Sequence, residues 1–266
     1  MATSPSRSLR TYRPQLLGLA GILIFLAVWQ LLPVVGLVDA RYFPNATSTL
    51  SLLWHELGTA DLWSDIGYTL WAWAAGLAIA TVAAVVLGTV IGLVPFLRRS
   101  THTMVEFLRP IPSVALIPLA ILTNGLSMKA ALVIIVFASF WQVFVQVLYG
   151  VADVDAVARD TARSFGLGRL ERFRSLVFPT ALPYLMTGLR LAATVALILA
   201  ITAQMFIGNP GLGRSIVTAQ AGAQYVQVYA LVIVTGLLGL VVNLGFRAIE
   251  RKVLKWHESV RSEEAL

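Results

Sequence analysis

The 266-residue sequence contains no cysteine, three histidines and few charged residues. Without cysteine the chain can form no disulfide, thiolate metal site or cysteine nucleophile. The histidines, His55, His102 and His257, lie far apart, and His55-Glu56 lacks the second histidine of a zinc-binding helix motif. The sequence also lacks a Gly-x-Ser-x-Gly elbow and a Gly-x-x-x-x-Gly-Lys-Ser/Thr phosphate loop. These absences argue against a hydrolase, a metalloenzyme and a nucleotide-hydrolysing chain.

The scarcity of charge is matched by an excess of apolar residues. Charged residues make up 12% and hydrophobic residues 58% of the chain, against about 25% and roughly 45–50% in soluble domains. Such a composition requires lipid around much of the surface, and we expect an all-α membrane protein. The net charge of +7 then reports orientation in the membrane, and we expect no nucleic-acid partner.

Six apolar stretches are long enough to cross a hydrocarbon core of roughly 30 Å as helices. The first is too long for a cleaved signal peptide, so we interpret it as a retained span. The third carries Arg109, Pro110 and Pro112 near its start, which predicts a broken or kinked helix. The six predicted spans are Leu16–Leu37, Tyr68–Val94, Met104–Leu122, Ala130–Val151, Leu182–Ile207 and Val228–Phe246.

The positions of lysine and arginine predict the orientation, because these residues accumulate on the cytoplasmic side. With a cytoplasmic N-terminus, 17 of the 20 lie inside and only Arg41, Lys129 and Arg214 lie outside. Both termini are therefore predicted to be cytoplasmic. We divide a single transmembrane domain, residues 1–266, into a cytoplasmic segment 1–15, a six-helix core 16–246 and a cytoplasmic tail 247–266.

The inner loop 152–179, between the fourth and fifth spans, has helical periodicity without the length to span. Its apolar residues recur at helical spacing: Val157, Ala158, Ala162 and Phe165. Asp153 or Asp155 can cap this short helix, while Gly166 and Gly168 can adopt the left-handed backbone that ends it. A second short helix, Arg169 to Phe178, should stop at Pro179. The loop is thus expected to form a rigid cytoplasmic protrusion.

This loop resembles the "EAA" loop of type I ABC importer permeases, Glu-Ala-Ala, three residues, Gly, nine residues, Ile-x-Leu-Pro. Asp160, Thr161 and Ala162 stand at the first three positions, Gly166 follows at the required spacing, and Leu176, Phe178 and Pro179 close the pattern. Weaker matches extend the resemblance over nearly the whole chain: Arg109-Pro-Ile-Pro112, Ile117-Pro118, Ala181-Leu-Pro183, Gly188-Leu-Arg190 and Gly211-Leu-Gly213. They are similar to the subgroup that imports nitrate, sulfonates, taurine and pyrimidine precursors.

The resemblance implies the type I permease fold and a prokaryotic inner or plasma membrane. It implies that the chain forms half of a translocation pathway, with a second permease copy, two ABC ATPase subunits and an extracytoplasmic solute-binding protein. ATP and Mg would be bound by the ATPase subunits, and no cofactor by this chain. The resemblance assigns ATPase coupling to a group of loop residues: Asp160, Thr161, Ala162, Gly166, Leu167, Gly168 and Pro179.

Polar residues within the predicted spans are candidates for the translocation pathway, because lipid makes unpaired polar groups expensive. Gln204 and Thr202 are predicted to face a dimer axis and line the route, and Thr194, Gln142 and Pro112 are further candidates. A structural interpretation stays open for each. Threonine in a membrane helix commonly bonds its own backbone, glutamine links neighbouring helices, and Pro112 either shapes a gate or only bends its helix.

Short segments on the predicted outer side also carry expectations. Ser51 to Leu57 is expected to form a helix on the outer surface. Asn209-Pro-Gly-Leu-Gly213 favours a turn, and the mildly apolar Ser215 to Ala221 either dips back toward the pathway or belongs to a surface loop. Six tryptophans are interpreted as interfacial anchors and packing residues: Trp29, Trp54, Trp63, Trp71, Trp73 and Trp141.

Two other classes of function compete with a permease subunit. An ion-coupled secondary carrier would need acidic groups well inside the spans, and none is found there, since Glu106 lies at a cytoplasmic margin. A membrane scaffold that recruits a cytoplasmic partner would use the protrusion and need no pathway. The sequence identifies neither the solute nor whether the second permease is identical.

Overall fold

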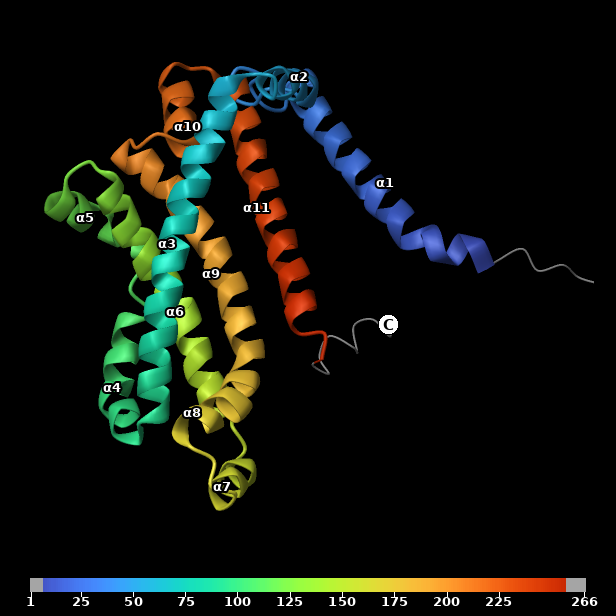
Figure 1. The fold of residues 1–266 in the computed structure, drawn as a ribbon. Coiled ribbons are helices and arrows are strands. Elements are labelled where there is room, and N and C mark those ends of the chain that lie inside the picture. Colours follow the sequence, from blue (N-terminus) through green and yellow to red (C-terminus); the bar gives the residue numbers. More distant parts are fainter. Residues whose placement is uncertain (1–6, 257–266) are drawn as a thin grey trace, which may run out of the picture. The chain divides into compact units, whose positions relative to one another are not determined.

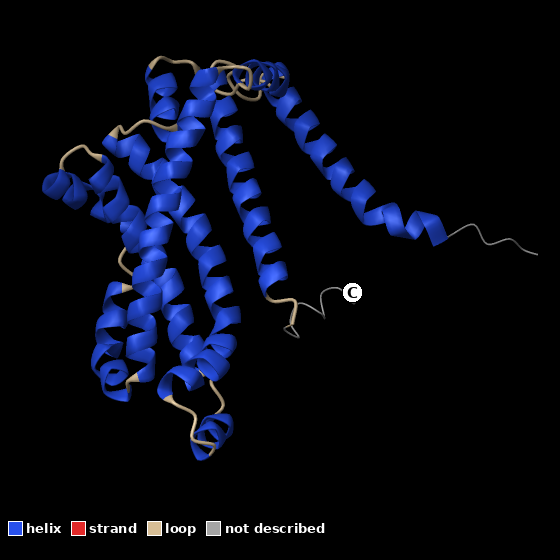
Figure 2. Ribbon diagram, viewed as in Figure 1, coloured by secondary structure: helices blue, strands red, loops and turns tan. Residues whose placement is uncertain are grey.

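The computed structural model describes residues 7–256, with side chains from residue 17 onward. Throughout these residues the only regular secondary structure is helix (Figure 2). Contacts divide the chain into two compact units, Met1–Ala60 with Ile216–Ile233 and Asp61–Ser215 with Val234–Leu266. The predicted single permease domain stays a prediction, and the tail from residue 257 lies outside the described residues.

The first unit contains α1 (Arg7–Val34) and α2 (Ala46–Glu56). Asn45 caps α2 by accepting a 2.8 Å hydrogen bond from the Ser48 N–H. The Gln30 Oε1 of α1 accepts bonds of 3.0 Å from both the N–H and the hydroxyl of Thr47. The helix expected at Ser51 to Leu57 is therefore confirmed, and it begins five residues earlier because Asn45 provides the cap.

The second unit holds most of the helices (Figure 1). Gly208, with φ +80°, ends the long α9, and α10 begins at Leu212 after a short turn. Both α10 and α11 continue across the boundary between the units. The elements are α3 (Ala60–Leu93), α4 (Pro95–Leu108), η1 (Ser113–Leu116), α5 (Ile117–Asn124), α6 (Met128–Ala152), α7 (Ala156–Ser164), α8 (Arg169–Arg172), η2 (Phe173–Val177), α9 (Phe178–Ile207), α10 (Leu212–Ala221) and α11 (Tyr225–Val253).

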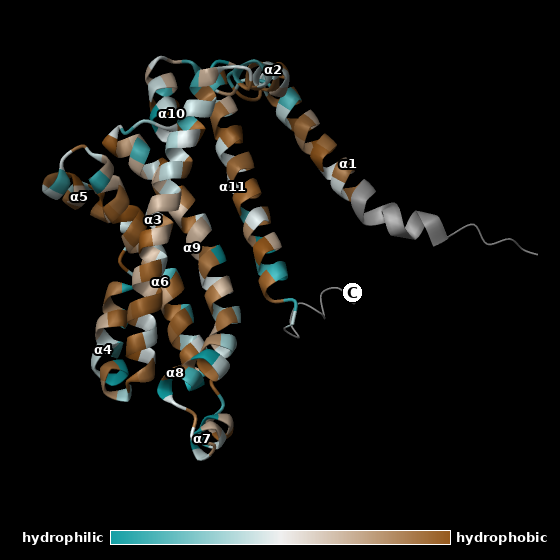
Figure 3. Cartoon of the chain, viewed as in Figure 1, coloured by the Kyte–Doolittle hydropathy of each residue, from teal (hydrophilic) through white to brown (hydrophobic). Residues whose placement is uncertain are grey.

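Five helices in the described residues are long and apolar enough to cross a membrane, and a bent pair would make a sixth. Apolar residues run along most of the length of α3, α6 and α9 (Figure 3). The observed spans agree with five of the predicted ones. The first ends earlier than predicted, at Val34, and the other four are longer, as in Arg169–Ile207 for the fifth and Tyr225–Val253 for the sixth. The extensions carry polar ends, which a hydropathy window leaves out.

The predicted third span, Met104–Leu122, is the bent pair, in which α4 and η1–α5 meet at 84°. The break at Arg109–Pro112 confirms the kink expected from Pro110 and Pro112. The predicted start is wrong, because α4 already begins at Pro95. This helix has charged residues on one side and buries none of its own side chains, so it differs from the apolar α6.

Glycines allow the spans of the second unit to approach closely. A Cβ on Gly150 would lie 2.7 Å from the Cα of Ala181, so α6 touches α9 backbone to backbone. Gly188 of α9 is similarly close to Gln142 and Val143 of α6. Since lipid tails are as apolar as leucine, such small-residue contacts and their dispersion energy hold membrane helices together.

Pro179 does not stop the preceding helix as predicted. Instead α8, the π-helical turn η2 and α9 follow one another without a break, and Pro179 lies in the first turn of α9. The Phe178 N–H bonds the Phe173 carbonyl five residues back. A proline has no N–H and its ring crowds the carbonyl four residues earlier, so the wider π turn accommodates it.

Candidate functional site

The segment between α6 and α9 begins with a capped helix, α7. Asp155 accepts bonds of 2.6 Å and 3.1 Å from the N–H groups of Val157 and Ala158. Of the two predicted caps, Asp155 is therefore the cap, while Asp153 accepts a 3.0 Å hydrogen bond from the Tyr184 hydroxyl of α9. One aspartate orients α7, and the other fastens the end of α6 to α9.

Gly166 ends α7 in the left-handed conformation, with φ +74°. The Gly166 N–H bonds the Arg163 carbonyl at 2.9 Å, and the Leu167 N–H bonds the Ala162 carbonyl at 3.0 Å. This pair of bonds is the Schellman arrangement, which satisfies carbonyls at a helix end. The prediction for Gly168 is wrong, since its φ of −63° is ordinary and it instead precedes α8.

The exposed side of α7 combines apolar and acidic groups. Val157 and Phe165 are 74% and 79% exposed, and Asp160 and Thr161 between them are exposed as well. Ala162 is buried, so the predicted apolar set does not form one buried face. Asp160 pairs with Arg163 at 3.2 Å, an exposed i,i+3 contact of small stabilising effect. Solvent-facing aromatic and aliphatic groups on a short fixed helix are suited to contact with another protein.

Gln204 lies in a buried polar cluster between α9, α3 and the start of α10. Its side chain is 1% exposed. The Gln204 Oε1 accepts bonds from the Thr69 hydroxyl at 3.0 Å and from the Gly213 N–H at 3.2 Å. The Leu212 N–H also donates to the Thr69 hydroxyl oxygen at 3.0 Å. Two side chains thus satisfy N–H groups at the amino end of α10.

Two members of this cluster, Thr69 and Asp65, were not foreseen from the sequence. Thr69 is fully buried, and Asp65 accepts a hydrogen bond from the Ser215 hydroxyl in the first turn of α10. The signal available was a threonine and an aspartate four residues apart on one helix face, at the end of an apolar run. Gly211, with φ +135°, leaves no room for a side chain beside Gln204.

The other pathway candidates lie apart from this cluster. Thr202 and Thr194 bond their own helix, donating to the Ile198 carbonyl at 2.8 Å and the Arg190 carbonyl at 3.2 Å. Gln142 is half-buried where α6 meets α9, and the exposed Pro112 precedes η1 at the break. The structure does not bring these residues together with Gln204.

An ion pair between spans was also not foreseen from the sequence. Arg190 of α9 and Glu250 of α11 approach to 3.2 Å and are both partly buried. A charged residue inside an apolar run needs such a partner, which was the available signal.

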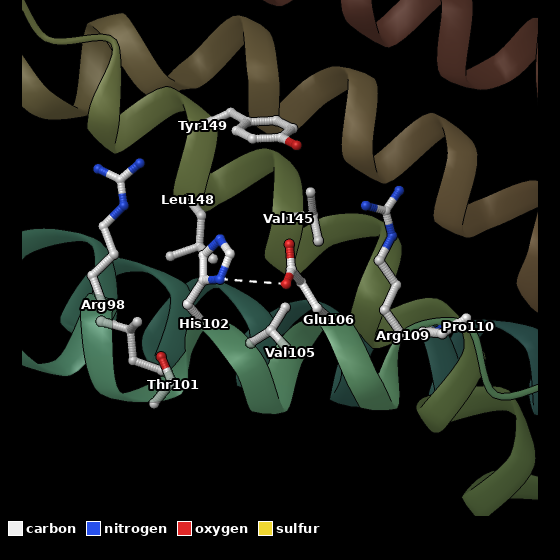
Figure 4. A pocket seen from close by; sticks show the side chains of 11 residues that line it. Arg98, Thr101, His102, Val105, Glu106, Arg109, Pro110, Val145, Leu148 and Tyr149 are labelled. Carbon is white, nitrogen blue, oxygen red and sulfur yellow. Dashed lines mark ion pairs between the residues drawn. The ribbon is translucent and has the colours of Figure 1, made fainter.

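A cleft of about 610 Å³ lies between α4 and α6 (Figure 4). Arg98 and Arg109 stand toward its two ends, and His102 and Glu106 form an ion pair of 3.5 Å between them. The Tyr149 ring lies across from this pair. Among the described residues, no group of three His, Cys, Asp or Glu side chains could hold a metal ion.

Membrane-crossing helices, a bent helix pair and a short capped helix between two spans define the fold of type I ABC importer permeases. A bacterial ABC transporter that imports the polysaccharide alginate has this fold, with a TM-score of 0.62 at 16% identity, covering 93% of this chain and 99% of that chain. The MetNI methionine ABC transporter matches with a TM-score of 0.57 at 18% identity, covering 77% of this chain and 97% of that chain.

The chain belongs to the family of binding-protein-dependent transport system inner membrane components, which matches residues 80–255. The putative aliphatic sulfonates transport permease protein SsuC of Escherichia coli is 28% identical, covering 90% of this chain and 91% of that protein. The taurine transport system permease protein TauC of the same organism is 26% identical, covering 92% of this chain and 91% of that protein. The nitrate import permease protein NrtB of Leptolyngbya laminosa is 27% identical, covering 85% of this chain and 83% of that protein.

Proposed function

We propose that the protein forms half of the translocation pathway of an ABC importer for a small anionic or heterocyclic solute, such as a sulfonate, taurine, nitrate or pyrimidine precursor. The solute class is supported by the names of three relatives. Two ABC ATPase subunits that bind ATP and Mg, a second permease copy and an extracytoplasmic binding protein complete the proposed machine. We infer that both termini are cytoplasmic, as the arginine and lysine distribution indicates.

One observation supports a coupling role for α7. Val157 and Phe165 are exposed beside Asp160 on a helix fixed at both ends by its cap and its Schellman turn. We infer that this face docks on the ATPase subunit, with Asp160 and Thr161 at its centre. The shape of the turn is set by Ala162, Gly166 and Leu167. The turn is connected by Gly168 and Pro179 to the continuous helix of α8, η2 and α9, which we call the α8–α9 rod.

The candidate pathway residues fall into two groups that differ in their contacts. Thr202, Thr194, Gln142 and Pro112 are proposed to line the route in the assembled permease pair. For Gln204 the contacts favour the other role that the sequence left open, because its carbonyl oxygen already joins α3, α9 and α10.

Reconstitution into proteoliposomes tests the function. Purified protein, ATPase subunits and binding protein should together import a sulfonate, taurine or nitrate when ATP is supplied on the ATPase side. Uptake driven by an ion gradient without the ATPase would support a carrier. ATPase binding without any uptake would support a scaffold. The ligand that copurifies with the binding protein would identify the solute.

A matched pair of variants tests the docking face. Phe165→Ala should weaken ATPase binding on the order of tenfold, since exposed aromatic anchors dominate interfaces. Phe107→Ala serves as the control, because Phe107 on α4 is 73% exposed against 79% for Phe165. Equal behaviour of the two variants would remove α7 from the proposed interface.

A further inference from the structure

A second cleft, of about 390 Å³, lies between α7, the α8–η2 segment and the turn that joins α3 to α4. We call it the arginine cleft. Its lining consists of apolar residues, among them Leu93 and Leu176, and of the four arginines Arg159, Arg163, Arg169 and Arg172. No acidic residue lines it. Arg163 and Arg169 are exposed, Arg159 and Arg172 are partly buried, and an anion among them would lower the repulsion between their charges.

The nearby acids within the described chain do not supply this compensation. Asp155 is engaged as the cap of α7. Asp160 pairs with Arg163 at 3.2 Å, but its carboxylate is 72% exposed and outside the cleft lining. The other three arginines of the cleft form no ion pair within 4.0 Å of a described residue.

Arg172 gives a second, independent indication of a ligand. Its Nε is buried and has no hydrogen-bond partner among the described residues. A buried N–H of a charged group without an acceptor is strongly unfavourable. An anionic oxygen in the arginine cleft would satisfy it, because the planar guanidinium fork matches phosphate in geometry and charge.

The apolar part of the lining narrows the class of anion. Leu93 is the last residue of the α3 span, and Leu176 lies in the first turns of the Arg169–Ile207 span. The arginine cleft therefore combines guanidinium groups with apolar residues at the ends of two membrane helices. A free phosphate would use only the first feature, whereas a phospholipid uses both through its headgroup and its acyl chains. Basic pockets between membrane helices bind such headgroups.

We propose that the arginine cleft binds the phosphate headgroup of an anionic phospholipid. The bound phosphate bridges Arg159 and Arg163 on α7 to Arg169 and Arg172 at the base of the α8–α9 rod. The bound phosphate thereby holds α7 at a fixed angle to the Arg169–Ile207 span. The site goes beyond the proposed transport function, since it requires neither solute nor ATP, and binding can be measured without either.

Lipid binding to the purified full-length chain in a neutral detergent tests the proposal, with cardiolipin as the probe and native mass spectrometry as the measurement. Arg172→Gln should weaken cardiolipin binding about fivefold, and the double variant Arg169→Gln/Arg172→Gln on the order of 30-fold, from about 1 kcal/mol per arginine. Arg174→Gln is the matched control, because Arg174 lies two residues away and lines a different hollow. It should leave cardiolipin binding unchanged.

Hydrogen exchange provides a second measurement that does not depend on the amount of folded variant. Cardiolipin added to the wild-type chain should slow exchange of the α7 amides, and it should not slow it in Arg172→Gln. Arg172→Lys keeps the charge and loses the planar fork. In this variant cardiolipin should slow exchange of the α7 amides less than in the wild-type chain and more than in Arg172→Gln. Phosphatidylcholine should have no effect on either chain.

Three results would overturn the proposal. An equal loss of binding in Arg174→Gln and Arg172→Gln would mean that general surface charge attracts the lipid. Protection of α7 by inorganic phosphate, equal to that by cardiolipin, would assign the arginine cleft to a free anion. Unchanged lipid binding in Arg172→Gln, together with loss of ATPase copurification, would assign it to an acidic side chain of the partner.

Discussion

At the scale of single residues, a buried amide and a hydroxyl solve the problem of starting a helix between apolar spans. The first N–H groups of α10 have no partners within their own helix. Thr69 and Gln204 supply acceptors for the Leu212 and Gly213 N–H groups, at 3.0 Å and 3.2 Å. The turn before α10 is therefore held by side chains from two different spans.

Gln204→Leu removes the shared acceptor and leaves the Gly213 N–H buried without a partner. We expect the free energy of unfolding to fall by about 1–2 kcal/mol, seen as a lower midpoint in thermal unfolding in detergent. Thr202→Val is the control, because Thr202 bonds only its own helix. A Gln204→Leu variant of unchanged stability but altered transport would instead favour the pathway role.

The two glycines after α7 make a second comparison at this scale. Both have open space where a Cβ would stand, but only Gly166 has a positive φ. Gly166→Ala should destabilise the end of α7 by about 1–2 kcal/mol, measured as faster hydrogen exchange at Leu167. Gly168→Ala should leave this exchange unchanged. Similar exchange in both variants would show that the left-handed turn is not required.

The sequence predicted the residues of this loop better than the contacts of the spans. Gly166 and an aspartate cap follow from local rules of helix ends. The Thr69–Gln204 contact joins residues 135 positions apart in the sequence. Rules of local structure predict no contact across such a separation. The role of Gln204 was therefore left open, and Thr69 was not identified.

At the scale of helices, the contact between α6 and α9 depends on Gly150. A Cβ there would meet backbone and side-chain atoms of Ala181 at 2.7 Å and 2.9 Å. Gly150→Ala should push the helices apart and lower stability by about 1–3 kcal/mol, measured by thermal unfolding in detergent. Gly245→Ala on α11, where nothing lies within 4 Å of the added atom, should be neutral or slightly stabilising.

If Gly150→Ala and Gly245→Ala have the same stability, the close approach of α6 and α9 would not be required in the folded protein. The predictions for these helices were correct where hydropathy decides, as for α6. The predictions failed at a proline, because a proline either breaks a helix or lies in a helix that continues past it. Pro110 and Pro112 break a helix, whereas Pro179 lies inside a continuous one because the π turn η2 makes room for it.

At the scale of the whole molecule, the absence of cysteine makes the predicted orientation directly measurable. Ser164 on α7 and Ser51 on α2 are both exposed. In intact cells a membrane-impermeant maleimide should label a Ser51→Cys variant. It should label Ser164→Cys only after the membrane is permeabilised. The reverse pattern would invert the topology inferred from the arginines and lysines.

Composition was sufficient to predict an all-helical membrane protein, because so large an excess of apolar residues is stable only when lipid surrounds it. The predicted partners could not be derived in the same way. The proposed pathway between two permeases and the proposed ATPase docking face would both be completed by other chains, so the residues of one chain form only one side of each contact. The exposed Phe165 is an example, since its exposure indicates an interface without identifying the occupant.

The unbroken Arg169–Ile207 helix has a mechanical consequence. Its 39 residues span roughly 58 Å, and the π turn η2 and Pro183 are two places along it where a helix commonly bends. If η2 and Pro183 keep their angles, a small tilt imposed near Arg172 reappears as a lateral swing at the opposite end, where Gln204 bonds the first turn of α10. A helix that behaves in this way would carry motion from one membrane face to the other without an intermediate relay.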